Sequence, residues 1–525
     1  MASTDSKELN KNQMNRESSK EDLVSPGPRK RPSNHKKYAK LVLKPCQVES
    51  HKKTLQMMNR QFAYIDVSPT GSGKTESAIA IALKRKMNIF VVAPPSVLHN
   101  WGVKSRMYGV RYTGITYHKL RAKENNVWLD FEDDAYSCTD KMIKYINRKT
   151  LFIFDEVQTA KNAETITNKS AHAIVKKIAT INTGSRIALL SATPYEMPKY
   201  SEAILKMLAI ITKDKMYFHN PKSRQYSFEN HGVYELIRRC KAVDSDRTMT
   251  VLHTYFVISK QNYHNICHDL FVQVLRKKYL TAIEPVYPVK LFAYNGYYNL
   301  TDEMEHKLHS AINRLKEEVR YSDTSEKSHY KTGARNNIMR ILHDIEWVLI
   351  EIIKYEATLI LEQDNMQKLV IFLWHTDTLD NIYEYFSKYN PLIINGKVPV
   401  DKRTKNMELF QEDTDSCRIM LCHPVSGGTG ISLDDTHGDR PRTMFATPSF
   451  KLIPSAQAMG RCVRMSSKSD ANYYCTYPQS HPELLNIVQS MITKEGVLRE
   501  CIGDLSTFTP GNLMQYKAPP LNTSK

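Results

Sequence analysis

One short segment has the residue types and spacing of a phosphate-binding loop. It follows the apolar run FAYIDV and precedes the helical run ESAIAIALKRK. In such a loop, glycine backbone N–H groups turn toward phosphates beside the positive end of a helix. The Lys74 ammonium would reach the β- and γ-phosphates, and the Thr75 hydroxyl would hold Mg²⁺. The expected nucleotide-binding residues of this loop are Pro69, Thr70, Gly71, Ser72, Gly73, Lys74 and Thr75.

Ser68 departs from the general pattern, which has glycine at the first position of the loop. An incidental turn rich in glycine and serine is therefore the alternative interpretation. The strand before the loop and the helix after it favour the phosphate-binding interpretation.

Two acids, Asp155 and Glu156, directly follow the apolar run Leu151–Phe154. In a doubly wound sheet, a carboxylate at the end of a strand lies beside the phosphate loop. Asp155 would hold Mg²⁺ through water, and Glu156 would polarise the attacking water. Alone, such a pair is more often a helix cap. The loop upstream favours the catalytic interpretation.

Two sets of short apolar runs would position these residues. Near-continuous runs of this length suit strands that are buried on both faces of a parallel sheet. The runs are Phe62–Val67, Ile89–Ala93, Leu151–Phe154 and Ile187–Leu190, then Leu369–Trp374, Leu392–Ile394, Ile419–Cys422, Thr443–Ala446 and Tyr473–Tyr477. The sequence therefore predicts an α/β fold with two parallel-sheet lobes.

A segment between the two sets has helical spacing and predicts a mostly helical insertion. The predicted domains are a disordered, basic-ended tail at 1–36, an ATP-binding lobe at 37–200, the helical insertion or linker at 201–360, a second lobe at 361–500 and a tail at 501–525.

The composition favours an acidic partner. Lysine and arginine total 74 against 55 acids, a formal net charge of +19, and the stretch from Arg29 to Arg60 holds ten basic residues and one acid. This charge favours nucleic acid, with a solvated tail as the alternative. The Arg29–Lys37 stretch could also direct nuclear import.

The cysteines and the apolar runs bear on location. Nine cysteines lie without a CxxC pair, which predicts neither a zinc ribbon nor a disulfide framework. The chain has no run of 18 apolar residues. We expect an intracellular protein without membrane contact.

Five further segments extend the pattern. They are Leu43–Gln47, Ala93–Trp101, Ser191–Pro194, Ser426–Leu433 and Gln457–Arg464. In this order they resemble the Gln motif and motifs Ia, III, V and VI of superfamily 2 helicases and translocases. The resemblance implies two RecA-like lobes that close on ATP and Mg²⁺ and move on nucleic acid.

The resemblance also assigns roles by position. Gln47 would read adenine, Arg464 would be the arginine finger and Arg461 would support a phosphate or motif II. Gly430 and Gln457 would complete the nucleotide site. The implied nucleic-acid contacts are Ser96, Asn100, Thr116, Ser426 and Thr429, and the implied coupling residues are Gln158, Ser191 and Thr193.

One position departs from the family pattern. Gln158 stands in motif II where the family usually has histidine or aspartate. An amide can bridge by hydrogen bonds but cannot ionise, so the departure concerns the coupling between hydrolysis and DNA.

The form of motif Ia and the Lys161-Asn162 pair look like the Swi/Snf-type branch or the related ATPases of large DNA viruses. The resemblance covers about residues 40–200 and 285–480. It implies a translocase on double-stranded DNA that remodels nucleoprotein, with transcription or replication proteins as partners. The alternatives are a strand-separating DNA or RNA helicase and an ATP-binding scaffold of a transcription complex. For a viral protein, the virion or virus factory is the expected location.

Overall fold

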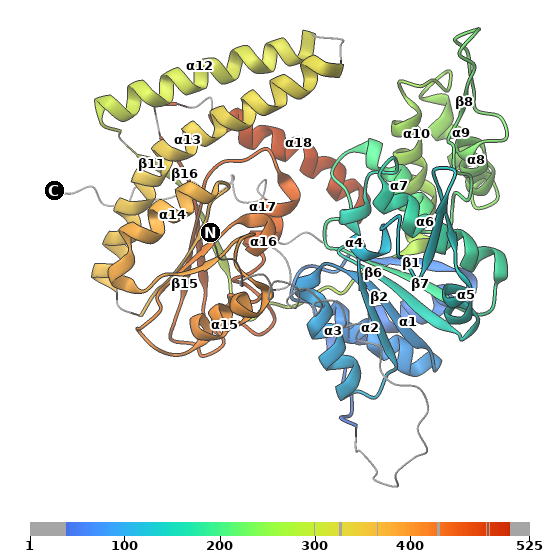
Figure 1. Ribbon diagram of the computed structural model, residues 1–525, viewed down its shortest axis with the longest axis horizontal. Coiled ribbons are helices and arrows are strands. Elements are labelled where there is room, and N and C mark those ends of the chain that lie inside the picture. The colour runs from blue at the N-terminus through green and yellow to red at the C-terminus, as the bar shows by residue number, and fades with distance from the viewer. Residues whose placement is uncertain are drawn as a thin grey trace, which may run out of the picture. The chain divides into compact units, whose positions relative to one another are not determined.

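The structure of the chain is a computed structural model, and the residues that it describes are 38–298, 300–324, 328–364, 366–427, 431–478, 480–481 and 484–503. Within them lie two six-stranded sheets (Figure 1). Every described pairing inside these sheets is parallel. The predicted fold class is confirmed. The predicted tail at 1–36 and most of the one at 501–525 lie outside the described residues.

The first sheet carries the phosphate loop and the acidic pair. Its strand order is β10-β1-β7-β6-β2-β3. The strands are β1 Ala63–Asp66, β2 Asn88–Ala93, β3 Tyr112–Thr116, β6 Thr150–Asp155, β7 Arg186–Leu190 and β10 Leu280–Thr281. Because parallel strands end at the same edge, the loop after β1 and the acids at the end of β6 lie at one edge of the sheet.

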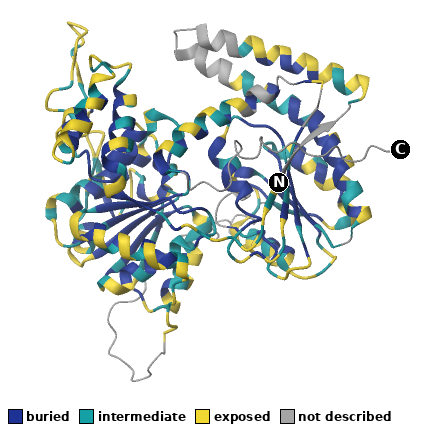
Figure 2. Ribbon diagram, turned by 180° about the vertical axis from the view of Figure 1, so that it is seen from behind, coloured by how far each residue is buried: buried dark blue, intermediate teal, exposed yellow. Residues whose placement is uncertain are grey.

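Side chains of this sheet alternate between two cores. On β2, Phe90 and Val92 join one apolar cluster, whereas Ile89 and Val91 join the other. Both sets are buried, as the dark layers of Figure 2 show. Burial on both faces explains why these strands are continuous apolar runs.

Helices cover both faces of the first sheet. The cluster of Ile89 includes residues of α1 Pro45–Arg60, α2 Lys74–Arg85 and α3 Pro95–Met107. The cluster of Phe90 includes residues of α5 Asp140–Asn147, α6 Ile166–Ile181, α7 Ser201–Met207, α8 Gly232–Lys241, α9 Ser245–His253, α10 Tyr263–Leu270 and α11 Arg276–Tyr279. The smaller elements are α4 Tyr117–Leu120, the hairpin of β4 Leu129–Glu132 and β5 Ala135–Cys138, and the hairpin of β8 Phe218–His219 and β9 Tyr226–Ser227.

The second sheet has the strand order β11-β16-β15-β12-β14-β13. Its strands are β11 Leu291–Tyr298, β12 Lys368–Phe372, β13 Leu392–Ile394, β14 Ile419–Cys422, β15 Arg442–Ala446 and β16 Ala471–Pro478. One face packs on α13 Ser328–Gln363 and α14 Thr376–Tyr385, and the other packs on α15 Val400–Gln411 and α17 Leu452–Met459. The remaining helices are α12 Asp302–Thr324, which pairs with α13, then α16 Pro424–Gly427 and α18 Leu484–Ile502.

The segment 201–360 is mostly helical, but its residues divide between the two lobes. Helices α7 to α11 share the core of the first sheet, and β10 extends that sheet beside β1. Strand β11 extends the second sheet beside β16. The chain therefore crosses between the sheets at residues 282–290, not at the expected boundaries. Two residues of β10 are too few to be seen as an apolar run.

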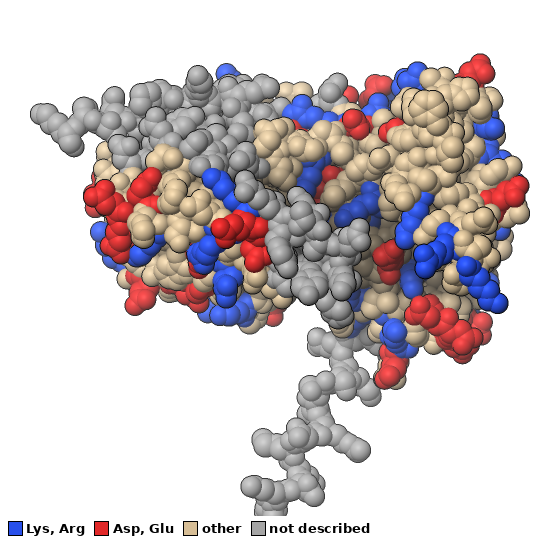
Figure 3. All heavy atoms as spheres, turned by 90° about the horizontal axis from the view of Figure 1, so that it is seen from above, with Lys and Arg blue, Asp and Glu red and all other residues tan. Residues whose placement is uncertain are grey.

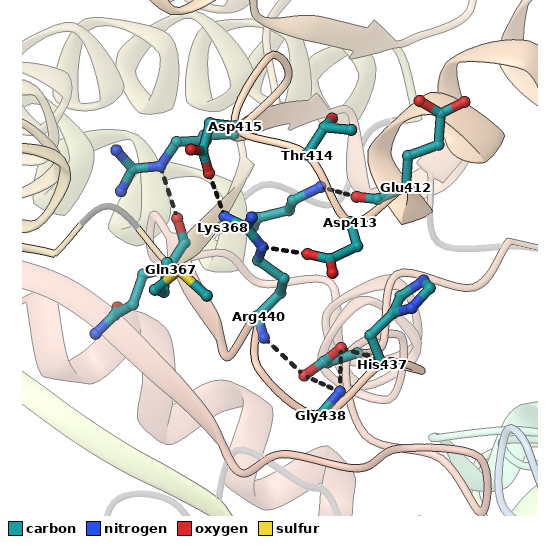
Figure 4. Close-up of polar contacts among 12 residues, drawn as sticks. Gln367, Lys368, Glu412, Asp413, Thr414, Asp415, His437, Gly438 and Arg440 are labelled. Atoms are coloured by element: carbon teal, nitrogen blue, oxygen red, sulfur yellow. Dashed lines mark hydrogen bonds and ion pairs between the residues drawn. The ribbon is translucent and has the colours of Figure 1, made fainter.

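Charged side chains hold the amino-terminal edge of the second sheet (Figure 4). Lys368, the first residue of β12, donates from Nζ to the Phe410 carbonyl oxygen at 2.9 Å. Arg440 donates from Nε to Asp413 Oδ1 at 2.7 Å and also pairs with Asp415. Burial, followed by the nearby arginines, lowers the pKa of Lys368 to about 8. These charges lie at the start of the strands, away from the edge where a ligand would bind.

Basic and acidic side chains are interspersed on the face shown in Figure 3. The basic stretch Arg29–Lys37 lies outside the described residues. Among the helices of the described part, none is long and apolar enough to cross a membrane.

Candidate functional site

The phosphate loop lies between β1 and α2, and two glycines give it its curvature. Gly71 and Gly73 have φ values of 75° and 87°, in the left-handed region that favours glycine. A Cβ atom on Gly73 would lie 2.2 Å from Gln47 Nε2, and one on Gly71 would lie 2.7 Å from Arg464 Cγ. Larger residues at these two positions would therefore be strained and would clash.

Lys74 is held at the start of α2 by the loop itself. Its Nζ donates to the carbonyl oxygens of Ser68 at 2.7 Å and Pro69 at 3.1 Å. Burial lowers the pKa of Lys74, while the carboxylates of Asp66, Glu156 and Asp155 act in the opposite direction. The ammonium therefore lies among acids with its donors directed to backbone oxygens.

Ser68 has a structural use that explains why it replaces glycine. Its backbone N–H donates to Asp66 Oδ1 at 2.9 Å, and its hydroxyl also donates to that oxygen. The same hydroxyl accepts a hydrogen bond from the Ile283 N–H at 2.8 Å. Both Asp66 and Ser68 are buried. Ser68 thus ties the phosphate loop to the segment that crosses between the sheets, a link that the sequence analysis did not find.

Asp155 is bound by two donors of its own lobe. Trp101 Nε1 donates to Oδ2 at 2.7 Å, and the Glu156 N–H donates to Oδ1 at 3.0 Å. Burial, followed by the Glu156 charge, raises the pKa of Asp155 to about 6. A cation next to this carboxylate would offset both causes. Trp101 was singled out in motif Ia, but its contact with Asp155 was not expected.

Glu156 is the centre of a hydrogen-bonded chain. Its Oε2 accepts from Gln158 Nε2 at 2.7 Å and from Gln457 Nε2 at 3.0 Å. Gln158 Oε1 in turn accepts from the Ser191 hydroxyl at 2.7 Å, and Ser191 Oγ accepts from the Thr193 N–H at 2.9 Å. The chain thus joins motifs II and III of the first lobe to motif VI of the second.

Both motif VI arginines reach toward this site. Arg461 Nη1 donates to the Ile431 carbonyl oxygen at 3.3 Å, and Arg464 Nη2 donates to the same oxygen. Burial, followed by the Arg464 charge, lowers the pKa of Arg461 to about 9, so the group is a cation at neutral pH. Arg464 Nε lies 3.9 Å from Asp434 Oδ1. The aliphatic part of the Arg464 side chain lies against Gly71 of the phosphate loop.

Gln47 lies at the loop, near the start of α1. Its Nε2 donates to the Ser72 carbonyl oxygen at 3.1 Å, and its Oε1 accepts from the Lys44 N–H at 2.8 Å. The structure therefore brings Gln47 to the phosphate loop. Its reading of adenine stays a prediction.

The nucleic-acid candidates of the first lobe lie beyond the ends of β2 and β3. Asn100 is exposed and Ser96 is partly buried on α3. Thr116 Oγ1 accepts from the Lys119 N–H at 3.1 Å and so caps α4. Ser426 lies in α16, whereas Thr429 and Gly430 lie outside the described residues.

The second lobe has an open cavity of about 570 Å³ that the sequence analysis missed. It is lined by Met339, Arg340, His343, Trp374, His375, Thr376, Asp377, Asp380 and Lys397. Trp374 to Asp377 begin two residues after the end of the buried strand β12, so this cavity lies at the carboxyl edge of the second sheet. The sequence signal that could have indicated this cavity is the apolar run Leu369–Trp374 with the polar residues His375, Thr376 and Asp377 directly after it.

The residues of the first site fit a magnesium nucleotide. Gly71 and Gly73 let the loop turn in the left-handed region at the amino end of α2, the end of a helix that favours a phosphate. The buried Nε–H of Arg464 makes no hydrogen bond to a described residue and lies 3.9 Å from the Asp434 carboxylate, beyond hydrogen-bond distance. A phosphate oxygen could accept this hydrogen bond. The Thr75 hydroxyl and the Asp155 carboxylate are oxygen ligands of the kind that Mg²⁺ takes.

Comparisons with known proteins agree with this geometry. Residues 40–196 match the family described as "Type III restriction enzyme, res subunit". The chain is 22% identical over 479 residues to "Putative ATP-dependent RNA helicase L364" of Acanthamoeba polyphaga mimivirus, covering 88% of this chain and 83% of that protein. It is 30% identical over 112 residues to "ATP-dependent DNA helicase DDM1" of Arabidopsis thaliana, covering 21% of this chain and 14% of that protein.

Among solved structures, the chain matches "Sulfolobus solfataricus SWI2/SNF2 ATPase core in complex with dsDNA". The sequences are 15% identical, the TM-score is 0.29, and the match covers 89% of this chain and 97% of that one. The family match in the first lobe and the long match to the mimivirus protein agree with the motif order. These matches and the motif order support a helicase-like ATPase of superfamily 2, of the Swi/Snf-type or viral kind.

Proposed function

We propose that this ATPase moves along double-stranded DNA and remodels the nucleoprotein that it meets. The observation that carries the proposal is the hydrogen bond from Gln457 Nε2 to Glu156 Oε2, 3.0 Å long. Through it, the residue proposed to activate water contacts the motif VI helix of the other lobe. A conformational change in one lobe during hydrolysis would therefore be transmitted to the other lobe. A translocase requires such coupling between its lobes.

ATP hydrolysis would use residues of both lobes. Lys74 would leave its two carbonyl partners for the β- and γ-phosphates, because phosphate oxygens carry full charge and carbonyl oxygens do not. Glu156 would orient the attacking water, with Gln158 and Gln457 fixing its carboxylate. Arg461 and Arg464 would stabilise negative charge on the transferring group, a large effect in a site that excludes water.

Magnesium would be held by Thr75 and Asp155 and would supply charge neutralisation between the phosphates. The raised pKa of Asp155 supports this assignment, because a cation lowers the cost of an ionised carboxylate there.

Nucleic acid would bind along the carboxyl edges of the two sheets. Ser96 and Asn100 on α3 offer a hydroxyl and an amide near a helix start, and the second-lobe cavity adds basic and aromatic groups. Such groups grip the phosphate backbone rather than read bases. Binding should therefore tolerate any sequence and weaken with salt.

Two substrate classes compete. The form of motif Ia and the Lys161-Asn162 pair favour duplex DNA, and Lys161 forms an ion pair with Glu196 that connects motifs II and III. A strand-separating helicase is the second candidate, because the mimivirus relative, matched over 88% of this chain, is named an RNA helicase.

One comparison tests the choice. ATPase rates of the full chain would be measured with blunt duplex DNA, single-stranded DNA and RNA of equal length. The same preparations would be given a triplex and a forked duplex. We expect duplex DNA to stimulate most, and the third strand to be displaced more readily than the fork is unwound. Efficient unwinding of the fork, with single strands or RNA as better stimulators, would replace the translocase by the helicase.

A further inference from the structure

Helix α13 places one carboxylate in the interior of the second lobe. Glu346 is 2% exposed, and its two oxygens collect hydrogen bonds from two separate loops. Oε1 accepts from the His375 N–H at 3.0 Å and from the Thr378 hydroxyl at 2.6 Å. Oε2 accepts from the Trp374 N–H at 2.9 Å and from the Thr447 hydroxyl at 2.7 Å.

These bonds are strong because the acceptor is charged and buried. A carboxylate in the interior is costly unless several donors meet it. His375 Nδ1 is also 3.1 Å from Oε1. Despite burial, donors from His375, Thr378 and Trp374 hold the pKa of Glu346 below its usual value. Glu346 is therefore ionised at neutral pH, and it fixes both loops at the carboxyl edge of the sheet.

One of the two loops forms the wall of the second-lobe cavity. Trp374 and His375, whose backbone N–H groups are held by Glu346, lie on this wall beside Arg340 of α13. The Lys451 ammonium lies 5.0 Å from the centre of the Trp374 ring. The lining of this cavity is mixed in charge, with the cations Arg340 and Lys397 and the acids Asp377 and Asp380. Its cations and the Trp374 ring suit a phosphate backbone and its bases. His343 Nε2 and Asp377 Oδ2, 2.6 Å apart, tie the same wall to α13.

Helix α13, which carries Glu346, also packs against α12. Leu349 and Ile352 of α13 pack in the cluster with Leu308 and Ile312 of α12. Figure 1 shows the two helices running side by side. A shift of this helical pair would therefore be passed to the cavity wall through Glu346.

We propose that Glu346 is a positioning residue through which α13 holds Trp374, His375 and the first turn of α14 in the form that grips the nucleic-acid backbone. This inference rests on the proposed function. It places the second-lobe cavity on the proposed nucleic-acid path along the carboxyl edges of the two sheets. It also gives the α12–α13 pair a part in holding the nucleic acid.

The test distinguishes an effect on nucleic-acid binding from an effect on ATP hydrolysis. Glu346→Ala, Glu346→Gln and wild type would be titrated with 40-base-pair duplex DNA, single-stranded DNA and RNA, with ATPase rate as the readout. For the nucleic acid that stimulates wild type most, the half-saturating concentration should rise about tenfold or more in Glu346→Ala, the loss expected for one or two charged hydrogen bonds. Glu346→Gln keeps one acceptor oxygen and should lie between the two. The rate and the KM for ATP without nucleic acid should stay unchanged.

The matched control is Glu351→Gln on the same helix. Glu351 is exposed, and its pair among the described residues is local, with Lys354 Nζ at 2.6 Å from its Oε1. This variant should behave as wild type. If Glu346→Ala does not fold, Thr447→Val and Thr378→Val each remove one donor, and a smaller rise in the same concentration is expected.

Three outcomes overturn the inference. The first is an unchanged half-saturating concentration in folded Glu346 or threonine variants. The second is an equal fall in the rates with and without nucleic acid, which would make Glu346 a merely structural residue. The third is a wild type that no nucleic acid stimulates or binds, in which case the proposed function fails as well. Only the first two leave the proposed function standing.

Discussion

The Ser191 hydroxyl donates to Gln158 Oε1 at 2.7 Å, and Gln158 Nε2 donates to Glu156 Oε2 at the same distance. The Gln158 amide therefore connects motif III to Glu156 of motif II. Its oxygen accepts from Ser191, and its NH₂ group donates to Glu156. Because an amide does not titrate, Gln158 adds no pH dependence of its own to this connection. The departure at position 158 thus preserves a bridge and removes a charge.

Replacing Gln158 by leucine should lower nucleic-acid-stimulated ATP turnover about tenfold, because a hydrogen bond to a charged group contributes about 1.5–3 kcal/mol. Nucleotide affinity should change little, since Lys74 and the loop glycines are untouched. Steady-state kinetics with and without duplex DNA would measure both. Ser191→Ala, which removes only one end of the bridge, is the control and should have a smaller effect. Equal turnover in Gln158→Leu and wild type would exclude a coupling role.

Trp101→Phe should weaken the metal site while keeping most of the packing. The indole N–H that donates to Asp155 at 2.7 Å would be lost from a fully buried position. With one donor fewer, the pKa of Asp155 would rise further above its present value of about 6. We expect the Mg²⁺ concentration for half-maximal ATPase to rise severalfold, and stability to fall by about 1–3 kcal/mol. Trp128→Phe, whose indole lies in the same lobe, is a packing control. An unchanged Mg²⁺ requirement would remove Trp101 from the site.

Much of this architecture follows from local pattern. Runs such as Ile419–Cys422 lie within one or two residues of the observed strands, because strands buried on both faces must be continuously apolar. Strand β3 was missed because its five residues, Tyr112–Thr116, contain glycine and two threonines and are mostly only partly buried. Strand β11 was missed because polar residues and glycine interrupt it.

The predicted ATP-site residues come together for a topological reason. Parallel strands deliver Asp155 and the phosphate loop to one edge, so position in sequence predicts proximity. Contacts such as Ile283 with Ser68 or Glu346 with Thr447 join segments that no local pattern relates. These contacts depend on how helices and crossings pack, and sequence spacing alone does not contain that information.

Lys74→Ala should abolish ATP hydrolysis, because the phosphates would lose the loop's point charge. Lys74→Arg is the control that keeps the charge but not the shape, since a planar guanidinium cannot replace a compact ammonium among the Ser68 and Pro69 carbonyl groups. We expect it to be strongly impaired as well. Release of phosphate from radiolabelled ATP would measure both. Substantial turnover by purified Lys74→Ala would mean that this loop is not the catalytic one.

His172 should make the first lobe less stable in acid. Burial, followed by the Lys206 charge, lowers the pKa of His172 to about 4 in the folded protein. Between pH 6.5 and pH 4, His172 is protonated in the unfolded chain but stays neutral in the folded chain. The free energy of unfolding therefore falls as pH falls through this window. The change is about 3 kcal/mol for a shift of this size. His172→Gln can still donate to the Ile211 carbonyl oxygen, which lies 3.2 Å from His172 Nε2.

Urea unfolding of the two proteins at pH 7 and pH 4 tests this dependence. The stability advantage of wild type over His172→Gln should shrink by about 3 kcal/mol on acidification. A constant difference between the proteins would show that His172 is not held neutral.

Ser68→Gly restores the general loop pattern and should nevertheless harm the protein. The hydroxyl accepts from the Ile283 N–H at 2.8 Å and donates to buried Asp66, so its removal leaves a buried donor and an acid each short of one partner. An unsatisfied buried donor costs about 1–3 kcal/mol. Glycine adds a further 0.5–1 kcal/mol or so of unfolded-state entropy. Thermal unfolding should show the loss. The KM for ATP should rise because, without the hydroxyl link, the loop would hold the residue-68 carbonyl oxygen that accepts from Lys74 less firmly in place.

Ser68→Ala separates the two causes, since it removes the hydroxyl but keeps the Cβ. If the hydroxyl link to the crossing segment is what matters, alanine should be nearly as destabilising as glycine, and Ser68→Thr should restore most of the stability if its extra methyl fits. A glycine variant as stable and as active as wild type would show that the crossing segment is held by its other contacts, such as the β1–β10 pairing, and that the serine is incidental.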